Sequence, residues 1–223
     1  MAVSNSRPSR TQQQSVGLII ILCGEMTRHS SQTDVTAIPE TALLLEALRF
    51  SAEKHRDQRR KDRGASPYIN HPIAVAHVLA TVAGVNDITT LLGAVLHDTL
   101  EDTDTTPEEL EAKFGRDLRV LVQELTDDKA LPKAERKRLQ IEHAPMASQR
   151  AQAIKVADKI CNVLDVTHSP PANWSTQRRR EYLDWTERVV AGCRGCNHAL
   201  ERYYQDVLRQ GRAALQDRIA RDS

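Results

Sequence analysis

The chain has 223 residues and a formal net charge of +1, from 31 Lys and Arg against 30 Asp and Glu. This length allows one domain with a continuous hydrophobic core. The balanced charge excludes a global electrostatic field that would recruit nucleic acid or anionic lipid. Four cysteines are too few and too unevenly spaced for a disulfide framework. We therefore expect a cytoplasmic protein with reduced thiols, in which any anion-binding site is a local cluster.

The first part of the chain differs in composition from the rest. Residues 1–35 are rich in Ser, Gln, Thr and Arg around one apolar stretch, VGLIIILCG, and this predicts an irregular or disordered extension. The stretch is far shorter than the ~20 apolar residues that span a bilayer, and no small-residue cleavage site follows it. We expect no membrane partner and one domain over residues 36–223.

From Pro39 onward the apolar residues recur at helical spacing, first in ALLLEALRFSAEKH, where Leu44, Leu45 and Leu48 lie on one face. Strand-like alternation is scarce. The spacing predicts further helices at about residues 72–83, 88–100, 107–114, 116–126, 133–143, 148–166, 175–192 and 195–219. The fold predicted from this pattern is an all-α helical bundle.

Two of these helix boundaries have specific signals. In TTPEEL, Thr105 or Thr106 can cap a helix whose first turn contains Pro107 and two acidic residues. In HSPPANW, Pro170 and Pro171 cannot continue a helix. The helix that starts near residue 148 must therefore end before them.

The helix predicted over residues 88–100 ends in a group of titratable side chains. His97 and Asp98 flank its buried stripe. Glu101 follows His97 by four residues, and Asp102 follows Asp98 by four residues. If the helix continues for that turn, all four side chains face one cleft. Carboxylates placed together at the negative end of a helix dipole repel each other, so we expect a cation there.

Two residues elsewhere in the sequence complete a ligand set. Pro72 favours an extended backbone at the preceding residue, His71, at the start of a helix. Asp158 shares a helix face with Ile154 and Cys161, where a carboxylate is costly unless it is paired or coordinated. Taken singly, each of these groups is better explained by a structural role: a helix cap, a solvated helix end or an ion pair with a neighbouring lysine. Their combination favours a metal site.

Two imidazoles and two carboxylates with open positions suit a Mn²⁺-like ion better than a closed structural zinc site, although they also accept Fe²⁺, Co²⁺ or Zn²⁺. Cys193 and Cys196 form a separate C-x-x-C pair. This pair could be half of a zinc site or a redox pair. Because no second cysteine pair or thioredoxin-like context accompanies it, two thiols on a helix is the simpler interpretation.

The order His, His-Asp, distant Asp resembles the HD superfamily of metal-dependent phosphohydrolases, matched here by His71, His97-Asp98 and Asp158. HDTLEDTDTT has the form found in the hydrolase domains of the alarmone-metabolising RelA/SpoT group, and KHRDQRRKDRGASPYINHP is similar to that group's opening motif. ELTDDKALPKAERKR is similar to the stand-alone small alarmone hydrolases of the metazoan type, Mesh1. The resemblance covers about residues 40–212 and implies an HD-domain helical bundle.

The resemblance also implies roles for individual residues. The metal ligands would be His71, His97, Asp98 and Asp158, and the catalytic acids Glu101 and Asp102. Arg60 and Lys61 match residues that hold the guanine nucleotide and its phosphates, and further pocket residues would be Lys155, Asn162, Arg178 and Tyr182. KVADKICNV departs from the more common K-L-A-D-R-L-x-N, which concerns the pocket lining and substrate preference, while the Asp and Asn are retained.

The implied activity is Mn²⁺-dependent hydrolysis of the 3′-pyrophosphate of (p)ppGpp to GDP or GTP and pyrophosphate, with this small nucleotide as the partner. Within the basic motif KHRDQRRKD, we expect Arg56 and Arg59 to be solvated surface residues with no role in substrate binding. One alternative is the same scaffold acting on another nucleotide, such as the 2′-phosphate of NADPH. Another is a non-catalytic alarmone-binding module. The oligomeric state is open, because helical spacing fits packing within one chain or across a dimer.

Overall fold

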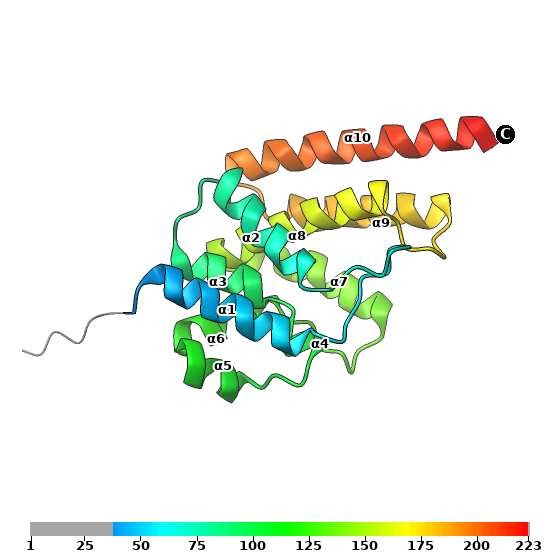
Figure 1. Cartoon of the computed structure of the whole chain (residues 1–223). Helices are drawn as coiled ribbons and strands as arrows, with labels where there is room; N and C mark the ends of the chain where they lie inside the picture. The colour runs from blue at the N-terminus through cyan, green and yellow to red at the C-terminus, as the bar shows by residue number, and fades with distance from the viewer. Residues whose placement is uncertain (1–37, 223) are drawn as a thin grey trace, which may run out of the picture. The chain divides into compact units, whose positions relative to one another are not determined.

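The computed structural model describes residues 38–222. The predicted extension over residues 1–35, with its apolar stretch and Cys23, lies outside this range. Within it the chain is built from helices, and an isolated β-bridge joins Arg59 to Pro67. The prediction of an all-α bundle is confirmed (Figure 1). The helices are α1 Glu40–Lys54, α2 Asn70–Thr81, α3 Ile88–Leu96, α4 Thr99–Asp102, α5 Pro107–Phe114, α6 Arg116–Leu125, α7 Lys133–His143, the 3₁₀ turn Ala144–Met146, α8 Gln149–His168, α9 Thr176–Ala191 and α10 His198–Asp222.

The two boundary signals are confirmed. The side chain of Thr106 accepts a hydrogen bond from the Glu109 N–H at 3.2 Å, so of the two candidate residues it is Thr106 that caps α5. Pro107 is the first residue of that helix, where a missing N–H has no cost. Helix α8 ends at His168, before the paired prolines.

The prediction of one helix through residues 88–100 is wrong at its end. Helix α3 stops at Leu96, and His97 and Asp98 form a turn before the short helix α4. The buried Thr99 hydroxyl donates to the Leu96 carbonyl at 2.6 Å, and such a side-chain bond competes with regular helix geometry. The Asp102 N–H still bonds to the Asp98 carbonyl at 2.8 Å, so a four-residue spacing is kept across the turn.

Two other expectations are also corrected. His71 is not extended: it is the second residue of α2, and its N–H bonds to the Tyr68 carbonyl at 3.0 Å. The first turn of a helix accepts Pro72 because N–H groups there have no partner within the helix. Cys193 and Cys196 lie in the turn between α9 and α10 and not on a helix, although both are buried.

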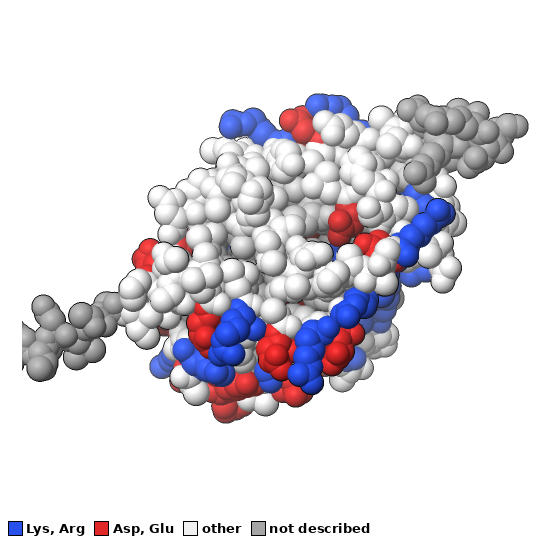
Figure 2. Space-filling view, in the orientation of Figure 1, with Lys and Arg blue, Asp and Glu red and all other residues white. Residues whose placement is uncertain are grey.

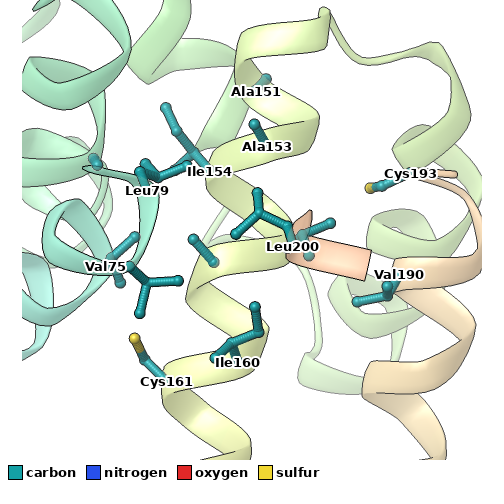
Figure 3. Close-up of a cluster of buried hydrophobic side chains, with 14 of the residues drawn as sticks. Val75, Leu79, Ala151, Ala153, Ile154, Ile160, Cys161, Val190, Cys193 and Leu200 are labelled. Carbon is teal, nitrogen blue, oxygen red and sulfur yellow. The ribbon is translucent and has the colours of Figure 1, made fainter. Parts of the chain in front are cut away.

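Helix α8 is the central element of the domain and packs against α2, α3, α6, α9 and α10. Figure 3 shows Val75 and Leu79 of α2 on one side of α8, and Val190 and Cys193 on the other. Gly93 of α3 packs closely against α6 and α8. A Cβ added to it would lie 2.7 Å from the Leu121 side chain of α6 and 3.0 Å from the Ile154 side chain of α8. The close approach of α2, α3 and α8 positions the site described below.

Charged side chains lie mostly at the periphery. Figure 2 shows Lys and Arg interleaved with Asp and Glu along the lower edge of one face, with uncharged residues across its middle. Many of these charges pair within one helix, as Arg49 does with Glu46. Among the described residues, no helix combines the length and the apolar character that a membrane span requires.

Candidate functional site

Three packed helices bring the predicted metal ligands together. His71 comes from the first turn of α2, His97 from the turn that follows α3 and Asp158 from the middle of α8, and their ligand atoms all lie within 4.8 Å of one another. The shortest separation is 3.0 Å, between His71 Nε2 and Asp158 Oδ1. Asp98 Oδ2 lies beside this group, 3.2 Å from His97 Nε2 and 4.0 Å from the His71 nitrogen.

The orientation of His97 fits a metal ion. Its Nδ1 lies 2.7 Å from the Ala94 carbonyl oxygen, which requires a proton on Nδ1. In the neutral ring the lone pair is therefore on Nε2, which faces the carboxylates. This nitrogen is buried and has no hydrogen-bond partner among the described residues. A buried nitrogen left without a partner and directed at two carboxylates is the arrangement that a divalent cation would complete.

The protonation of the site follows the same logic. Burial lowers the pKa of His97, but the negative charges of Asp98 and Asp158 outweigh this effect and raise the pKa to about 9. Burial raises the pKa of Asp98, while the charge of His97 brings it below its usual range. The proton on His97 compensates the carboxylates, and a metal ion would displace it.

Asp158 has a defined set of partners. Lys159 donates to its Oδ2 at 2.7 Å and Asn162 donates to its Oδ1 at 2.6 Å. Burial raises the pKa of Asp158, but the charge of Lys159 and the hydrogen bond from His71 bring it well below its usual range. The ion pair that a purely structural interpretation requires is thus present, and one carboxylate oxygen still faces both histidines.

Glu101 and Asp102 line a cavity of about 210 Å³ together with all four predicted ligands. The expectation that the acidic cluster faces one cleft is therefore confirmed despite the break between α3 and α4. Glu101 accepts hydrogen bonds from Arg136 at 3.1 Å and from the Asp127 N–H at 3.2 Å. Asp102 is ion-paired with Lys129. Burial and the charge of Asp127 raise the pKa of Glu101.

Tyr68 is a site residue that was not identified from the sequence. Its hydroxyl lies 2.7 Å from Asp98 Oδ2 and 3.1 Å from Asp102 Oδ2, so one proton is shared between a predicted ligand and a predicted catalytic acid. The Tyr68 ring stacks on the buried His55 ring, with centroids 4.8 Å apart. Its position three residues before His71, within the motif PYINHP, was the available signal.

A larger cavity of about 850 Å³ adjoins the metal side and shares residues with it, including Arg60, Tyr68 and Asn162. Of the predicted substrate residues, those that line this cavity are Arg60, Lys61, Asn162 and Tyr182. Lys155 lines the metal-side cavity. Arg178 lines a third hollow of about 390 Å³ next to the large one, with its guanidinium 4.6 Å from the Trp174 ring.

The basic motif divides between the cavity and the solvent. Arg60 pairs with Asp165 and bonds to Asn162 at 3.2 Å, while Arg56 is exposed and pairs with Glu53 as a solvated residue does. Arg59 is exposed as well, as expected of a solvated residue, and it also lines the cavity. Further cations that the sequence did not single out line the same cavity, and these are Lys129, Lys133 and Lys137.

Comparison with known proteins agrees with this geometry. The HD domain family model matches residues 47–184. The guanosine-3′,5′-bis(diphosphate) 3′-pyrophosphohydrolase MESH1 of Xenopus tropicalis is 54% identical over 162 residues, which are 73% of this chain and 90% of the relative. The human protein of that name is 52% identical over 171 residues, 77% of this chain and 96% of its own length.

Among solved structures, one is a metazoan ortholog of SpoT that hydrolyses ppGpp. It matches with a TM-score of 0.75 and 45% sequence identity, over 78% of this chain and 98% of its own. A second, from Listeria monocytogenes, matches with a TM-score of 0.55 and 26% identity, over 67% of this chain and 96% of its own. With its all-α fold and these identities, the chain belongs to the HD-domain family and, within it, to the MESH1 group.

Proposed function

We propose that this protein hydrolyses the 3′-pyrophosphate of (p)ppGpp, releasing GDP or GTP and pyrophosphate, with Mn²⁺ as the metal. One observation carries the proposal: a cluster of two buried histidines and two half-buried aspartates lies beside Glu101 and Asp102, next to a cavity lined in part by basic residues. The relatives that bear the name of this activity are 52% and 54% identical to the chain.

The residues divide the chemistry among them. His71, His97, Asp98 and Asp158 would hold the metal ion. When bound, such an ion makes water more acidic and neutralises charge on a phosphoryl oxygen. Glu101, held by Arg136 and the Asp127 N–H, is placed to orient the attacking water and accept its proton. Asp102 would assist the transfer of a proton to the leaving oxygen.

The substrate carries two diphosphates and needs cations away from the metal. Lys61, Lys133 and Lys137 line the larger cavity, and Arg60 can meet phosphate or stack on the purine ring. The aromatic rings of Trp174 and Tyr182 line the same cavity. Lys155, Asn162 and Arg178 remain proposed pocket residues.

A second candidate is removal of the 2′-phosphate of NADPH on the same scaffold. The observation in its favour is that the lining of the 850 Å³ cavity includes the uncharged side chains of Ala74, Val78 and Tyr203 besides the basic residues, and such a surface suits a second nucleoside. A non-catalytic alarmone-binding module is the third candidate. The paired positions of Glu101 and Asp102 in the metal-side cavity favour catalysis over binding alone.

The deciding experiment incubates the purified protein with ppGpp and Mn²⁺, with and without chelator, and separates the products by anion exchange. Release of GDP and pyrophosphate that Asp98→Ala, Glu101→Ala and chelation each abolish is expected. Binding of ppGpp without turnover would favour the sensing module. Phosphate release from NADPH with no reaction on ppGpp would favour the second candidate.

A further inference from the structure

We propose that Arg136 is a positioning residue for hydrolysis, which holds the Glu101 carboxylate in the orientation needed to receive the water proton. The inference rests on the proposed function. Arg136 Nη1 donates to Glu101 Oε1 at 3.1 Å, and the Asp127 N–H donates to Oε2 at 3.2 Å. Each carboxylate oxygen therefore has one fixed donor, which leaves its remaining lone pairs to face the metal-side cavity.

The contact differs from the surface ion pairs of the same helix. Only 25% of the Arg136 side chain and 19% of the Glu101 side chain are exposed, and the contact joins α7 to α4. Arg138, two residues along α7, is 53% exposed and pairs with Glu135 and Glu142 of its own helix. Exposed pairs of this second kind contribute little. A half-buried pair between two elements fixes the geometry of both.

The surroundings of Glu101 explain why a cation is needed. Asp98, Asp102 and Asp127 each act on it as a like charge, so an unsupported carboxylate would turn away from the cavity or take up a proton. An arginine stays protonated at neutral pH and does not compete for the transferred proton. Its planar fork also sets the plane of the carboxylate, which the point charge of a lysine does not.

The remaining contacts of Arg136 indicate that stability alone does not account for it. Its Nε is buried and has no hydrogen-bond partner among the described residues, and a buried donor left unpaired costs free energy. Helix α7 also places Lys133 and Lys137 on the wall of the larger cavity. One helix therefore contacts both the larger cavity and Glu101.

The test compares Arg136→Met and Arg136→Lys with a matched control, Arg138→Met, in the full chain. The measurements are kcat and KM for ppGpp at saturating Mn²⁺, the Mn²⁺ affinity and the melting temperature. We expect Arg136→Met to lower kcat by about 10²-fold, because misplacement of a reacting group costs this much. KM and Mn²⁺ affinity stay within about threefold, since neither ligands nor cavity cations change. Arg136→Lys recovers part of kcat, and Arg138→Met behaves like wild type.

A double-mutant cycle decides whether Arg136 acts through Glu101. In a Glu101→Gln background, Arg136→Met is expected to cause no further loss of kcat, because the two residues act as one unit. Independent, multiplicative losses overturn the inference, and so does an unchanged kcat in Arg136→Met. If Arg136→Met does not fold, Arg136→Lys with wild-type kcat and melting temperature overturns it as well. Absence of turnover in wild type and Arg138→Met rejects the proposed function itself, and the inference with it.

Discussion

The two walls of the site are built in different ways. On the metal side, His71 and His97 are buried, and Asp158 accepts hydrogen bonds from two neighbours on its own helix. On the nucleotide side, Lys61 and Lys133 are exposed and have no ion pair within residues 38–216. The metal wall is thus fixed by protein contacts before any ligand binds, whereas the nucleotide wall includes two cations, Lys61 and Lys133, that need not break an ion pair to bind a ligand. We expect damage to the first to lower kcat and damage to the second to raise KM.

The largest effect should follow loss of the metal wall's ligands. Replacing Asp158 by Ala removes one ligand and leaves Lys159 buried without its carboxylate, so we expect kcat to fall by more than about 10³-fold. Chelation of the wild type should reproduce this loss, and added Mn²⁺ should reverse it. The matched control is Asp206→Ala, an exposed aspartate paired with Arg209. Full activity after complete removal of divalent ions would contradict the assignment of this wall.

Packing beneath the metal wall gives the next largest effect. Gly93→Ala would place a Cβ 2.7 Å from Leu121 and 3.0 Å from Ile154. We expect the free energy of unfolding to fall by about 1–3 kcal/mol, the usual range for overpacking a core. Urea denaturation measures the change. Gly64→Ala, whose new Cβ would meet nothing closer than Asp62 at 3.9 Å, should stay within about 0.5 kcal/mol of wild type. Equal stability of the two variants would mean that the Leu121 and Ile154 side chains move aside at no cost.

The nucleotide wall should respond differently. Lys61→Ala removes an exposed cation from the cavity wall, and we expect KM for ppGpp to rise by about tenfold while kcat stays within about threefold, since one charge-assisted phosphate contact contributes roughly 1.5 kcal/mol. The rise should shrink at high salt. Steady-state kinetics at two ionic strengths measure both quantities. Arg209→Ala, an exposed cation of α10 away from the cavity, serves as the control. A fall in kcat with unchanged KM would contradict this prediction and would mean that Lys61 acts in the chemical step and not in substrate binding.

Much of the metal wall could be predicted from the sequence because its signals are local. Asp158 stood on an apolar helix face, and His97-Asp98 was spaced four residues from two more carboxylates. The contacts that join distant segments carry no local signal. Tyr68 meets Asp98 across 30 residues, and Arg136 meets Glu101 across 35. The break after α3 was missed for a related reason, because it depends on how one buried hydroxyl bonds to the backbone.

The smallest expected effect is a shift in the pH dependence of kcat/KM. It depends on Asp127, which lies in the segment between α6 and α7 and contacts Glu101. Burial and the charge of Asp127 raise the pKa of Glu101. A general base must be ionised, so kcat/KM should fall as pH drops through the raised pKa of Glu101. Asp127→Asn removes one of the charges that raise this pKa and keeps the backbone N–H that bonds Glu101. The acid limb of the pH profile should therefore move to lower pH, with little change in the plateau. Asp128→Asn, an exposed neighbour in the same segment, is the control. A limb that moves to higher pH, or equally in both variants, would show that Glu101 does not set it.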